Sequence, residues 1–306
     1  HIPVCHTRCT YGNFFSATWL EEMRNYCDVL CRQLVELRER SVFSDTVYIG
    51  GGTPSVLPSD CLDRLLRACS ALLNEGGEFT VECNPDDVTD SLAATVRGCG
   101  VNRVSLGVQT FDDARLRLLR RRHTAEKARE AVALLRAHDI INVSIDLMYG
   151  FPDETIGQWD HDIIEVLSLR PAHISAYCLT VEEGTALNRQ LSKGLLPPLP
   201  AEDEQRGMYY LLRNRLIDAG YSHYEISNFC LPDCHSRHNS GYWQDKPYTA
   251  LGAGAYGYDK ENGIRYSNIA DIREYIRRVN SGVSVVDFRE DIDDAIHYND
   301  LITTAM

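Results

Sequence analysis

Residues 46–54 read TVYIGGGTP, a β-branched and aromatic run that ends in three glycines, a threonine and a proline. This composition predicts a short β-strand followed by a tight turn. Comparable strand-like runs follow at residues 79–82, 103–106, 143–146 and 173–177. Each is followed by a longer stretch with apolar residues at helical spacing, as expected for helices that cover a sheet. The repeated unit of strand, loop and helix predicts an α/β fold with parallel strands and right-handed crossovers.

The uninterrupted series of five or six such units favours one curved, barrel-like sheet over two separate sheets. In a barrel of this kind, functional residues gather at the carboxyl ends of the strands. Residues 50–54, 82–85, 107–111 and 146–152 directly follow predicted strands and carry glycines or polar side chains. We therefore expect these four loops to build a shared binding site for a small molecule.

A proline-rich turn at residues 197–200 interrupts the regular alternation. It predicts a boundary between a barrel domain at residues 1–200 and a smaller α+β accessory domain at residues 201–306, which opens with a predicted helix. The chain begins with His1 and ends at Met306 within a helix-like run. We therefore expect the natural N-terminus to precede His1 and the accessory domain to be incomplete.

The composition indicates which partners and which cellular compartment to expect for the protein. The 306 residues include 31 Lys and Arg against 44 Asp and Glu, a net charge of -13. A chain this acidic would repel a phosphate backbone, so we expect no nucleic-acid partner. No run of about 18 apolar residues is present, which predicts no membrane-spanning helix and leaves peripheral membrane association open. The 11 cysteines are an odd number in a long chain, which favours reduced thiols in a cytoplasmic protein.

Residues 1–14 read HIPVCHTRCTYGNF, with cysteines at Cys5 and Cys9 and a glycine at Gly12. The run resembles the C-x-x-x-C-x-x-C signature of the radical SAM family, in which three thiolates hold a [4Fe-4S] cluster whose open iron binds S-adenosylmethionine. The resemblance implies that Cys5 and Cys9 are cluster ligands. Gly12 stands at the third cysteine position without a side-chain donor, so a cluster would need His6, water or substrate as a replacement ligand. As a pair, the two thiols are also compatible with an ordinary loop.

The loops after the predicted strands carry residue types that suit a small polar ligand. Their glycines allow close approach of the backbone and can form an anion-binding nest, although a glycine triplet is also typical of a tight turn. Carboxylates at Glu82 and Asp146 could accept hydrogen bonds from an ammonium group and from ribose hydroxyls, and Gln109 and Arg121 suit a carboxylate or a ribose. Taken singly, each would also suit a salt bridge or a loop cap. The resemblance to the radical SAM family implies that S-adenosylmethionine is bound by Gly51, Gly52, Thr53, Glu82, Gln109, Arg121 and Asp146.

The sequence HNSGYW, which begins at His238, matches the pattern H-N-x-x-Y-W. This run is similar to the heme chaperone branch of the family, which implies that heme is contacted by His238, Tyr242 and Trp243. A neutral imidazole is a good iron ligand, and aromatic rings stack on a flat macrocycle. Two other interpretations stay open: His238 caps a turn, or it binds zinc together with Cys230 and Cys234.

Together the motifs predict a radical SAM protein that resembles the HemW heme chaperones and the oxygen-independent coproporphyrinogen III oxidases, with a partial (β/α)6 TIM-type barrel and an α+β accessory domain. The branch implies a heme chaperone that transfers heme to an acceptor hemoprotein, with S-adenosylmethionine, a [4Fe-4S] cluster and heme as ligands. One alternative is a coproporphyrinogen III dehydrogenase, a radical decarboxylase of porphyrin biosynthesis, although relatives with that activity carry a further cysteine where Phe14 stands. Another is an inactive form that keeps ligand binding only, because of Gly12. No catalytic residue is assigned.

Overall fold

The computed structural model describes residues 1–7, 9–12, 15–16 and 21–305. The chain divides into two compact units, each assembled from separate stretches of sequence. Unit 1 comprises residues 1–5, 15–79 and 236–306, and unit 2 comprises residues 6–14 and 80–235. The predicted domain boundary near residue 200 coincides with neither edge of these units and stays a prediction.

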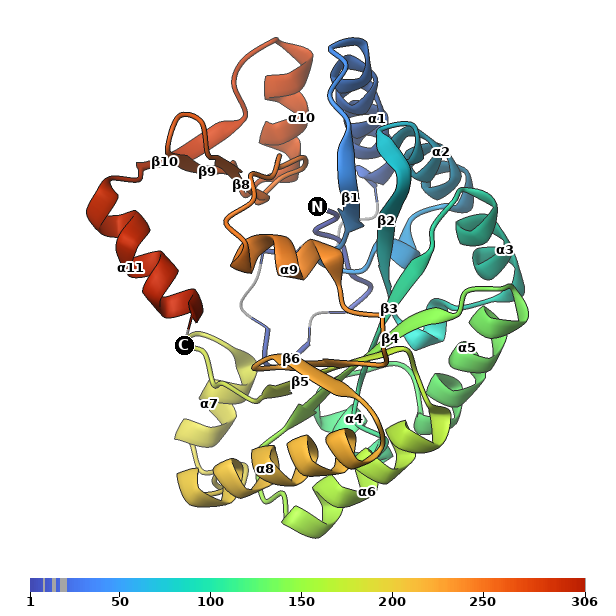
Figure 1. The fold of residues 1–306 in the computed structure, drawn as a ribbon, viewed down its shortest axis with the longest axis vertical. Coiled ribbons are helices and arrows are strands. Elements are labelled where there is room, and N and C mark those ends of the chain that lie inside the picture. Colours follow the sequence, from blue (N-terminus) through green and yellow to red (C-terminus); the bar gives the residue numbers. More distant parts are fainter. Residues whose placement is uncertain (8, 13–14, 17–20, 306) are drawn as a thin grey trace. The chain divides into compact units, whose positions relative to one another are not determined.

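Unit 2 alternates strands and helices in the order that the sequence predicts. Its elements are η2 (Pro85–Asp87), α3 (Asp90–Gly98), β3 (Arg103–Gln109), α4 (Asp113–Leu118), α5 (Ala125–Ala137), β4 (Asn142–Tyr149), α6 (Ile156–Leu169), β5 (His173–Cys178), α7 (Ala186–Ser192), α8 (Glu202–Asp218), β6 (Ser222–Glu225) and β7 (Asn228–Cys230). The strands expected from residues 103, 143 and 173 onward are β3, β4 and β5, and the helix expected after the proline-rich turn is α8. Figure 1 shows α3, α5 and α6 in a row along the strands of this unit.

The strands of the described residues are ordered β1-β2-β3-β4-β5-β7-β6 in one seven-stranded sheet. β2 (Leu73–Cys83) runs through both units, since unit 1 includes it up to Phe79 and unit 2 from Thr80 on. The pairs β2–β3, β3–β4 and β4–β5 are parallel, as predicted. β7 pairs antiparallel with β5 and with β6, because a short turn instead of a crossover helix joins β6 to β7. The sheet therefore ends in a hairpin instead of a sixth parallel strand.

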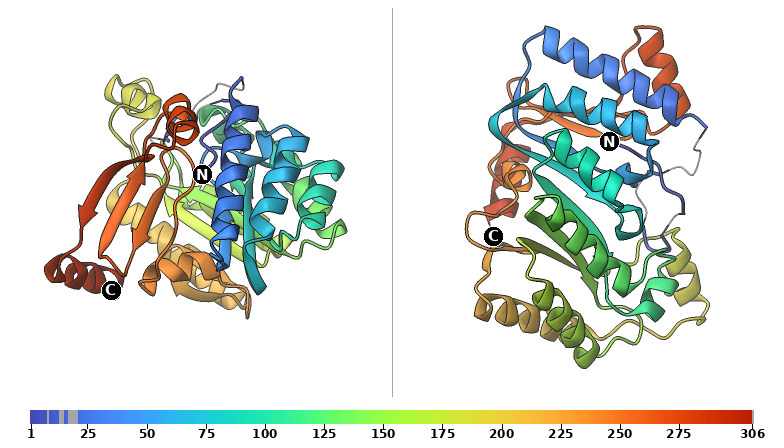
Figure 2. Two further views of the ribbon diagram at one scale, coloured as in Figure 1. Left: turned by 90° about the horizontal axis from the view of Figure 1, so that it is seen from above. Right: turned by 90° about the vertical axis from the view of Figure 1, so that its right-hand side faces the viewer.

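Unit 1 joins helices from both ends of the chain to strands from both ends. Its elements are α1 (Met23–Glu39), β1 (Ser44–Ile49), η1 (Pro54–Val56), α2 (Ser59–Ser70), α9 (Arg237–Trp243), β8 (Tyr256–Asp259), β9 (Ile264–Asn268), α10 (Ile272–Asn280), β10 (Val286–Asp291) and α11 (Asp294–Ala305). The strands β8, β9 and β10 form an antiparallel sheet in the order β10-β9-β8 (Figure 2). The last residue, Met306, lies outside the described residues.

Buried tyrosines connect the separate stretches of unit 1. The hydroxyl of Tyr26, on α1, donates to the carbonyl oxygen of His1 at 2.9 Å and accepts from the amide of Ala253 at 2.7 Å. Tyr275, on α10, meets the Tyr26 ring edge-on with 5.8 Å between the ring centroids. Both tyrosines are at most 1% exposed, so three distant parts of the sequence share one core.

Two features of the whole chain bear on its surroundings. Among the helices of the described residues, none is long and apolar enough to cross a membrane. All 11 cysteines, each among the described residues, are thiols and not disulfides, and seven of them are buried: Cys5, Cys27, Cys61, Cys69, Cys83, Cys99 and Cys230.

Candidate functional site

Alternate residues of three neighbouring strands give the unit 2 sheet a polar face. We define this polar face by Ser105, Gly107 and Gln109 of β3, Ser144 and Asp146 of β4, and His173 and Ser175 of β5. In register, Ser105 lies beside Ser144, and Asp146 lies between Gly107 and Ser175. The residues between them, such as Val104 and Leu106, are completely buried and point to the opposite side of the sheet. Parallel sheets are usually apolar on both faces, so a polar face marks a candidate site.

Asp146 is the carboxylate of the polar face. The hydroxyl of Ser105 donates to both of its carboxylate oxygens at 3.1 Å. Burial raises the pKa of Asp146, whereas the charge of Arg103 and the hydroxyls of neighbouring serines lower it. Glu82, on β2, lies beside Ser105 in register and is half-buried. The structure thus brings Glu82 and Asp146 to either side of one serine, as expected for two carboxylates of a shared site.

Gln109 and Arg121 meet at Gly107. A Cβ atom on Gly107 would lie 3.0 Å from Nη2 of Arg121 and 3.1 Å from Nε2 of Gln109. Nη2 of Arg121 donates to the carbonyl oxygen of Gly107, and its Nη1 donates to Sγ of Cys9 at 3.6 Å. Gln109 has a φ of 71° and follows a register shift in β3, so its side chain is re-aimed by an unusual backbone. Three predicted site residues, Cys9, Gln109 and Arg121, therefore lie together.

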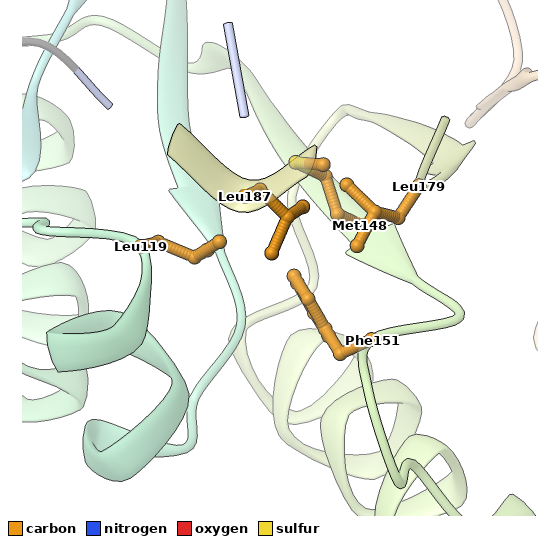
Figure 3. Packing of buried hydrophobic residues seen from close by; sticks show 5 residues of the cluster. All are labelled: Leu119, Met148, Phe151, Leu179 and Leu187. Atoms are coloured by element: carbon orange, nitrogen blue, oxygen red, sulfur yellow. The ribbon is translucent and has the colours of Figure 1, made fainter. Parts of the chain in front are cut away.

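The segment that carries Cys9 and Gly12 is anchored in unit 2. The amide of Thr10 donates to the Leu119 carbonyl at 3.4 Å, and the Thr10 carbonyl accepts from the amide of Leu187 at 2.9 Å. Tyr11 packs against the apolar cluster that Figure 3 shows, formed by Leu119, Met148, Phe151, Leu179 and Leu187. Burial raises the pKa of the Tyr11 hydroxyl, and the adjacent Cys9 thiol adds to the effect. The loop is thus held by backbone hydrogen bonds and by packing.

The donor set is a poor match for a [4Fe-4S] cluster. Gly12 is half-buried and offers no side-chain donor at the third ligand position. Among the described residues, no group of three or more His, Cys, Asp or Glu side chains is placed to hold a metal ion. The zinc interpretation stays a prediction, because Cys230 and Cys234 belong to unit 2 and His238 belongs to unit 1. By contrast, the carboxylates of Glu82 and Asp146, the amide of Gln109 and the guanidinium of Arg121 do fit the ammonium, carboxylate and ribose groups of S-adenosylmethionine.

Glu154 fixes the loop that follows β4. Its Oε2 accepts from the amides of Gly150 at 2.6 Å and Phe151 at 3.1 Å, while its Oε1 lies 3.3 Å from Nη1 of Arg115. Burial raises the pKa of Glu154 to about 7, against the opposing charge of Arg115. The carboxylate thus immobilises the chain just beyond the strand that carries Asp146.

His173 is the first residue of β5 and lies at the amino end of the polar face. Its Nδ1 is 2.8 Å from Oγ of Ser144, and its Nε2 is 2.7 Å from the hydroxyl oxygen of Tyr224. The side chain is completely buried. Burial lowers the pKa of His173 well below its usual value, with the charge of Arg103 acting in the same direction. The imidazole is therefore neutral and bridges two hydroxyl groups.

In unit 1, the glycine-rich turn after β1 holds the start of the chain. The amides of Gly52 and Thr53 donate to the carbonyls of Ile2 and Val4, both at 2.8 Å. A Cβ on Gly52 would come within 2.6 Å of the Val4 carbonyl oxygen and 2.9 Å of Sγ of Cys5, so only glycine fits. The Thr53 hydroxyl donates to Sγ of Cys5 at 3.5 Å. Gly51, with a φ of 121°, makes a parallel bridge with Ile2. The turn thus brings the predicted residues Gly51, Gly52, Thr53 and Cys5 together.

His238, also in unit 1, lies on α9 and contacts residues of β1. Its Nδ1 is 3.0 Å from Oγ1 of Thr46, and its ring stacks on Tyr48 with 4.9 Å between centroids. On the other side of the ring, Nε2 is 2.9 Å from the hydroxyl oxygen of Tyr242. We call His238, Thr46, Tyr48 and Tyr242 the His238 cluster. Trp243, the next residue of α9, is 47% exposed.

Several residues of both regions were not predicted from the sequence. Ser105, Ser144 and His173 share the polar face with Asp146, and the period-two alternation of the predicted strands contained the signal for them. Thr46 and Tyr48 occupy alternate positions of β1, so they share one face of that strand, but nothing in their sequence indicates contact with His238.

Comparisons with known proteins agree with this architecture. The model of the Radical SAM superfamily matches residues 1–165. The protein of Lactococcus lactis named heme chaperone HemW is 38% identical over 280 residues, which cover 90% of this chain and 73% of that protein. The Bacillus subtilis protein of the same name is 34% identical over 282 residues, which cover 90% and 74%. A mouse protein named radical S-adenosyl methionine domain-containing protein 1, mitochondrial, is 37% identical over 263 residues, which cover 84% of this chain and 59% of that protein.

A solved structure shows the same fold. The Escherichia coli coproporphyrinogen III oxidase HemN, described as a radical SAM enzyme, superposes with a TM-score of 0.85 at 19% identity, over 100% of this chain and 74% of that chain. At this low identity the likeness shows the fold alone. It confirms the predicted α/β fold of the radical SAM type.

Proposed function

The chain belongs to the radical SAM superfamily and, within it, to the HemW family of heme chaperones, and we propose that it binds heme and transfers it to an acceptor hemoprotein. The observation that carries the proposal is the His238 cluster. A neutral imidazole is a good ligand for heme iron. Tyr242 and Trp243, on the same short helix, are 43% and 47% exposed, so aromatic surface is available beside that imidazole for a flat macrocycle.

A hemin titration followed by Soret absorbance tests this proposal. His238→Ala is expected to weaken hemin binding at least tenfold and to abolish the spectrum of an imidazole-ligated iron. His161→Ala removes another exposed histidine, on α6 in unit 2, and serves as the matched control. Equal hemin affinity in all three proteins would exclude His238 as the ligand. Transfer is then tested by mixing the heme-loaded protein with heme-free respiratory hemoproteins.

We propose that the polar face of unit 2, together with Glu82 and Arg121, binds S-adenosylmethionine, the cofactor that the family implies. The carboxylate of Asp146 accepts hydrogen bonds from the ribose hydroxyls, and Glu82 accepts from the ammonium group. Arg121 and Gln109 bind the carboxylate or the ribose. The close fit of Arg121 and Gln109 around Gly107 supports this assignment. The assignment of Gly51, Gly52 and Thr53, which belong to unit 1, to the same cofactor stays a prediction from the family resemblance.

A second function, ligand binding without radical chemistry, is favoured by Gly12. Two thiolates, Cys5 and Cys9, do not complete the three-cysteine ligand set of the family's [4Fe-4S] cluster, which supplies the electron for cleavage of S-adenosylmethionine. The coproporphyrinogen III dehydrogenase alternative needs that chemistry and is therefore not favoured. Phe14, the other residue that distinguishes this chain from such enzymes, lies outside the described residues.

Anaerobic reconstitution with iron and sulfide tests the role of Gly12. Gly12→Cys is expected to raise bound iron toward about four per chain, whereas Gly12→Ser, which adds a side chain but no thiolate, is expected to leave it unchanged. If the unaltered chain already binds a full cluster, another group replaces the third cysteine. Unchanged iron in Gly12→Cys would exclude this loop as a cluster site.

We infer that the protein works in the cytoplasm, with heme and an acceptor hemoprotein as its partners. The 11 free thiols support a reducing compartment. The net charge of -13 disfavours a nucleic-acid partner. Peripheral association with a membrane stays a prediction.

A further inference from the structure

Both ring nitrogens of His238 are already occupied within unit 1. Nδ1 lies 3.0 Å from the hydroxyl oxygen of Thr46, in a partly buried contact. Nε2 lies 2.9 Å from the hydroxyl oxygen of Tyr242, in an exposed contact one helical turn further along α9. An imidazole can bind iron only through a nitrogen with a free lone pair. One of these two contacts must therefore be released before heme iron can bind.

The surroundings of His238 hold its backbone and its ring plane in place. Glu78, which is 5% exposed, accepts hydrogen bonds from the backbone amides of Arg237 and His238 at 2.8 and 3.0 Å. Ser236 caps the start of α9 through the amide of Asn239. The ring itself lies on Tyr48 with an interplanar angle of 22°. The backbone and the ring plane are thus both held. A half-turn of the ring in this plane would place carbon atoms against the hydroxyls of Thr46 and Tyr242, so Nδ1 stays toward Thr46.

The two contacts differ in how easily they are released. The hydroxyl of Thr46, on β1, contacts Nδ1 of His238. This contact is partly buried, so Nδ1 is the less accessible nitrogen for a macrocycle. Tyr242 is 43% exposed and its ring meets Tyr248 edge-on at 4.9 Å, so rotation of one side chain releases Nε2 to solvent. Metal-bound histidines commonly donate from the second ring nitrogen to a fixed oxygen, which sets the tautomer and the ring orientation. Thr46 occupies that position.

We propose that Nε2 of His238 is the iron-binding atom, that Thr46 is a positioning residue that retains the proton on Nδ1, and that the Tyr242 hydroxyl is a latch that heme must displace. This inference rests on the proposed heme-binding function. Because one neutral hydrogen bond shifts an equilibrium constant by about fivefold, the latch lowers heme affinity by a similar factor and favours release to an acceptor. A chaperone requires such reversible binding.

The test compares Tyr242→Phe, which keeps the ring and removes only the hydroxyl, with Tyr248→Phe as the matched control. At one pH, Tyr242→Phe is expected to bind hemin about fivefold more tightly than the unaltered protein, and Tyr248→Phe is expected to bind it equally. Thr46→Val is expected to bind hemin several-fold more weakly, because the tautomer is no longer fixed. Equal or weaker binding by Tyr242→Phe would overturn the latch.

A second measurement separates failure of the latch from failure of the proposed function. The 15N chemical shifts of His238 in the heme-free protein report which nitrogen carries the proton. We expect a protonated Nδ1 and an unprotonated Nε2, with the Nε2 shift altered in Tyr242→Phe and not in Tyr248→Phe. A proton on Nε2 would overturn the proposal even if heme binds. If these shifts are as expected but His238→Ala binds hemin normally, the hydrogen bond between Tyr242 and Nε2 exists, but heme ligation by His238, and the latch with it, is excluded.

Discussion

The two units each contain a histidine that bridges an aliphatic hydroxyl and a tyrosine hydroxyl. In unit 2, His173 lies between Ser144 and Tyr224 at 2.8 and 2.7 Å. In unit 1, His238 lies between Thr46 and Tyr242 at 3.0 and 2.9 Å. His173 is completely buried, whereas the contact of His238 with its tyrosine is exposed. The hydrogen-bond pattern is the same, so accessibility decides which histidine serves the fold and which one can exchange a partner for a ligand.

The largest expected effect comes from removing each imidazole. His173→Ala leaves a cavity and two hydroxyl groups without their partner inside unit 2, so it is expected to lower the free energy of unfolding by about 3 kcal/mol. His238→Ala opens onto solvent, where water replaces the imidazole, and is expected to lower it by less than about 1 kcal/mol. Urea denaturation of both variants measures the difference. Equal losses of stability in the two variants would mean that His238 stabilises the fold as much as His173 does.

Lowering the pH is expected to reduce the stability contribution of the buried histidine, His173. Because burial lowers the pKa of His173 well below its usual value, the unfolded chain takes up a proton near pH 6.5 that the folded state does not. The contribution of this histidine to stability is therefore full above pH 6.5 and is lost below it, by up to about 1.4 kcal/mol per pH unit. His173→Gln lacks this loss, so its stability deficit relative to the unaltered protein is expected to shrink between pH 7.5 and 5.5. A deficit that stays constant or grows would mean that His173 is protonated in the folded state.

The two tyrosines provide a third, smaller contrast. Tyr224→Phe leaves Nε2 of a buried imidazole without its partner and is expected to lower the free energy of unfolding by about 1–2 kcal/mol. Tyr242→Phe exposes Nε2 of His238 to water and is expected to change it by less than about 0.5 kcal/mol. The measurement is a pair of urea titrations at neutral pH. If Tyr242→Phe were the more destabilising of the two, its hydroxyl would serve the fold and could not act as a latch.

The sequence predicted the strands that carry the polar face and the His238 cluster, but not the side-chain contacts within them. The strands β1 to β5 followed from short β-branched runs, because strand pattern is local in sequence. Glu82 and Gln109 lie at the carboxyl ends of β2 and β3, as the same pattern predicted, whereas Asp146 lies within β4, three residues before its end. Ser105 and Ser144 could have been found from the period of two, since they precede Gly107 and Asp146 by two residues.

The His238 cluster could not have been predicted in the same way. Thr46 and His238 are 192 residues apart, and their contact depends on how unit 1 is assembled from distant stretches. The antiparallel hairpin of β6 and β7 was likewise not expected, because four residues of β6 and three of β7 are too short for a clear alternation. Long-range packing, which leaves no periodic signal in the sequence, explains why the His238 cluster was missed, whereas the hairpin was missed because its strands are short.

The smallest expected effect on stability comes from Trp243, beside His238, where a substitution is expected to change hemin affinity more than stability. Trp243→Ala is expected to change the free energy of unfolding by less than about 0.5 kcal/mol, because the side chain is 47% exposed. Its loss removes aromatic surface beside His238, so hemin affinity is expected to fall about three- to tenfold. Phe288→Ala removes a 54% exposed aromatic ring from β10 and should leave hemin affinity unchanged. Equal losses in the two variants would mean that hemin adsorbs to exposed aromatic rings in general, and the contrast between the two histidines would then carry no information about heme.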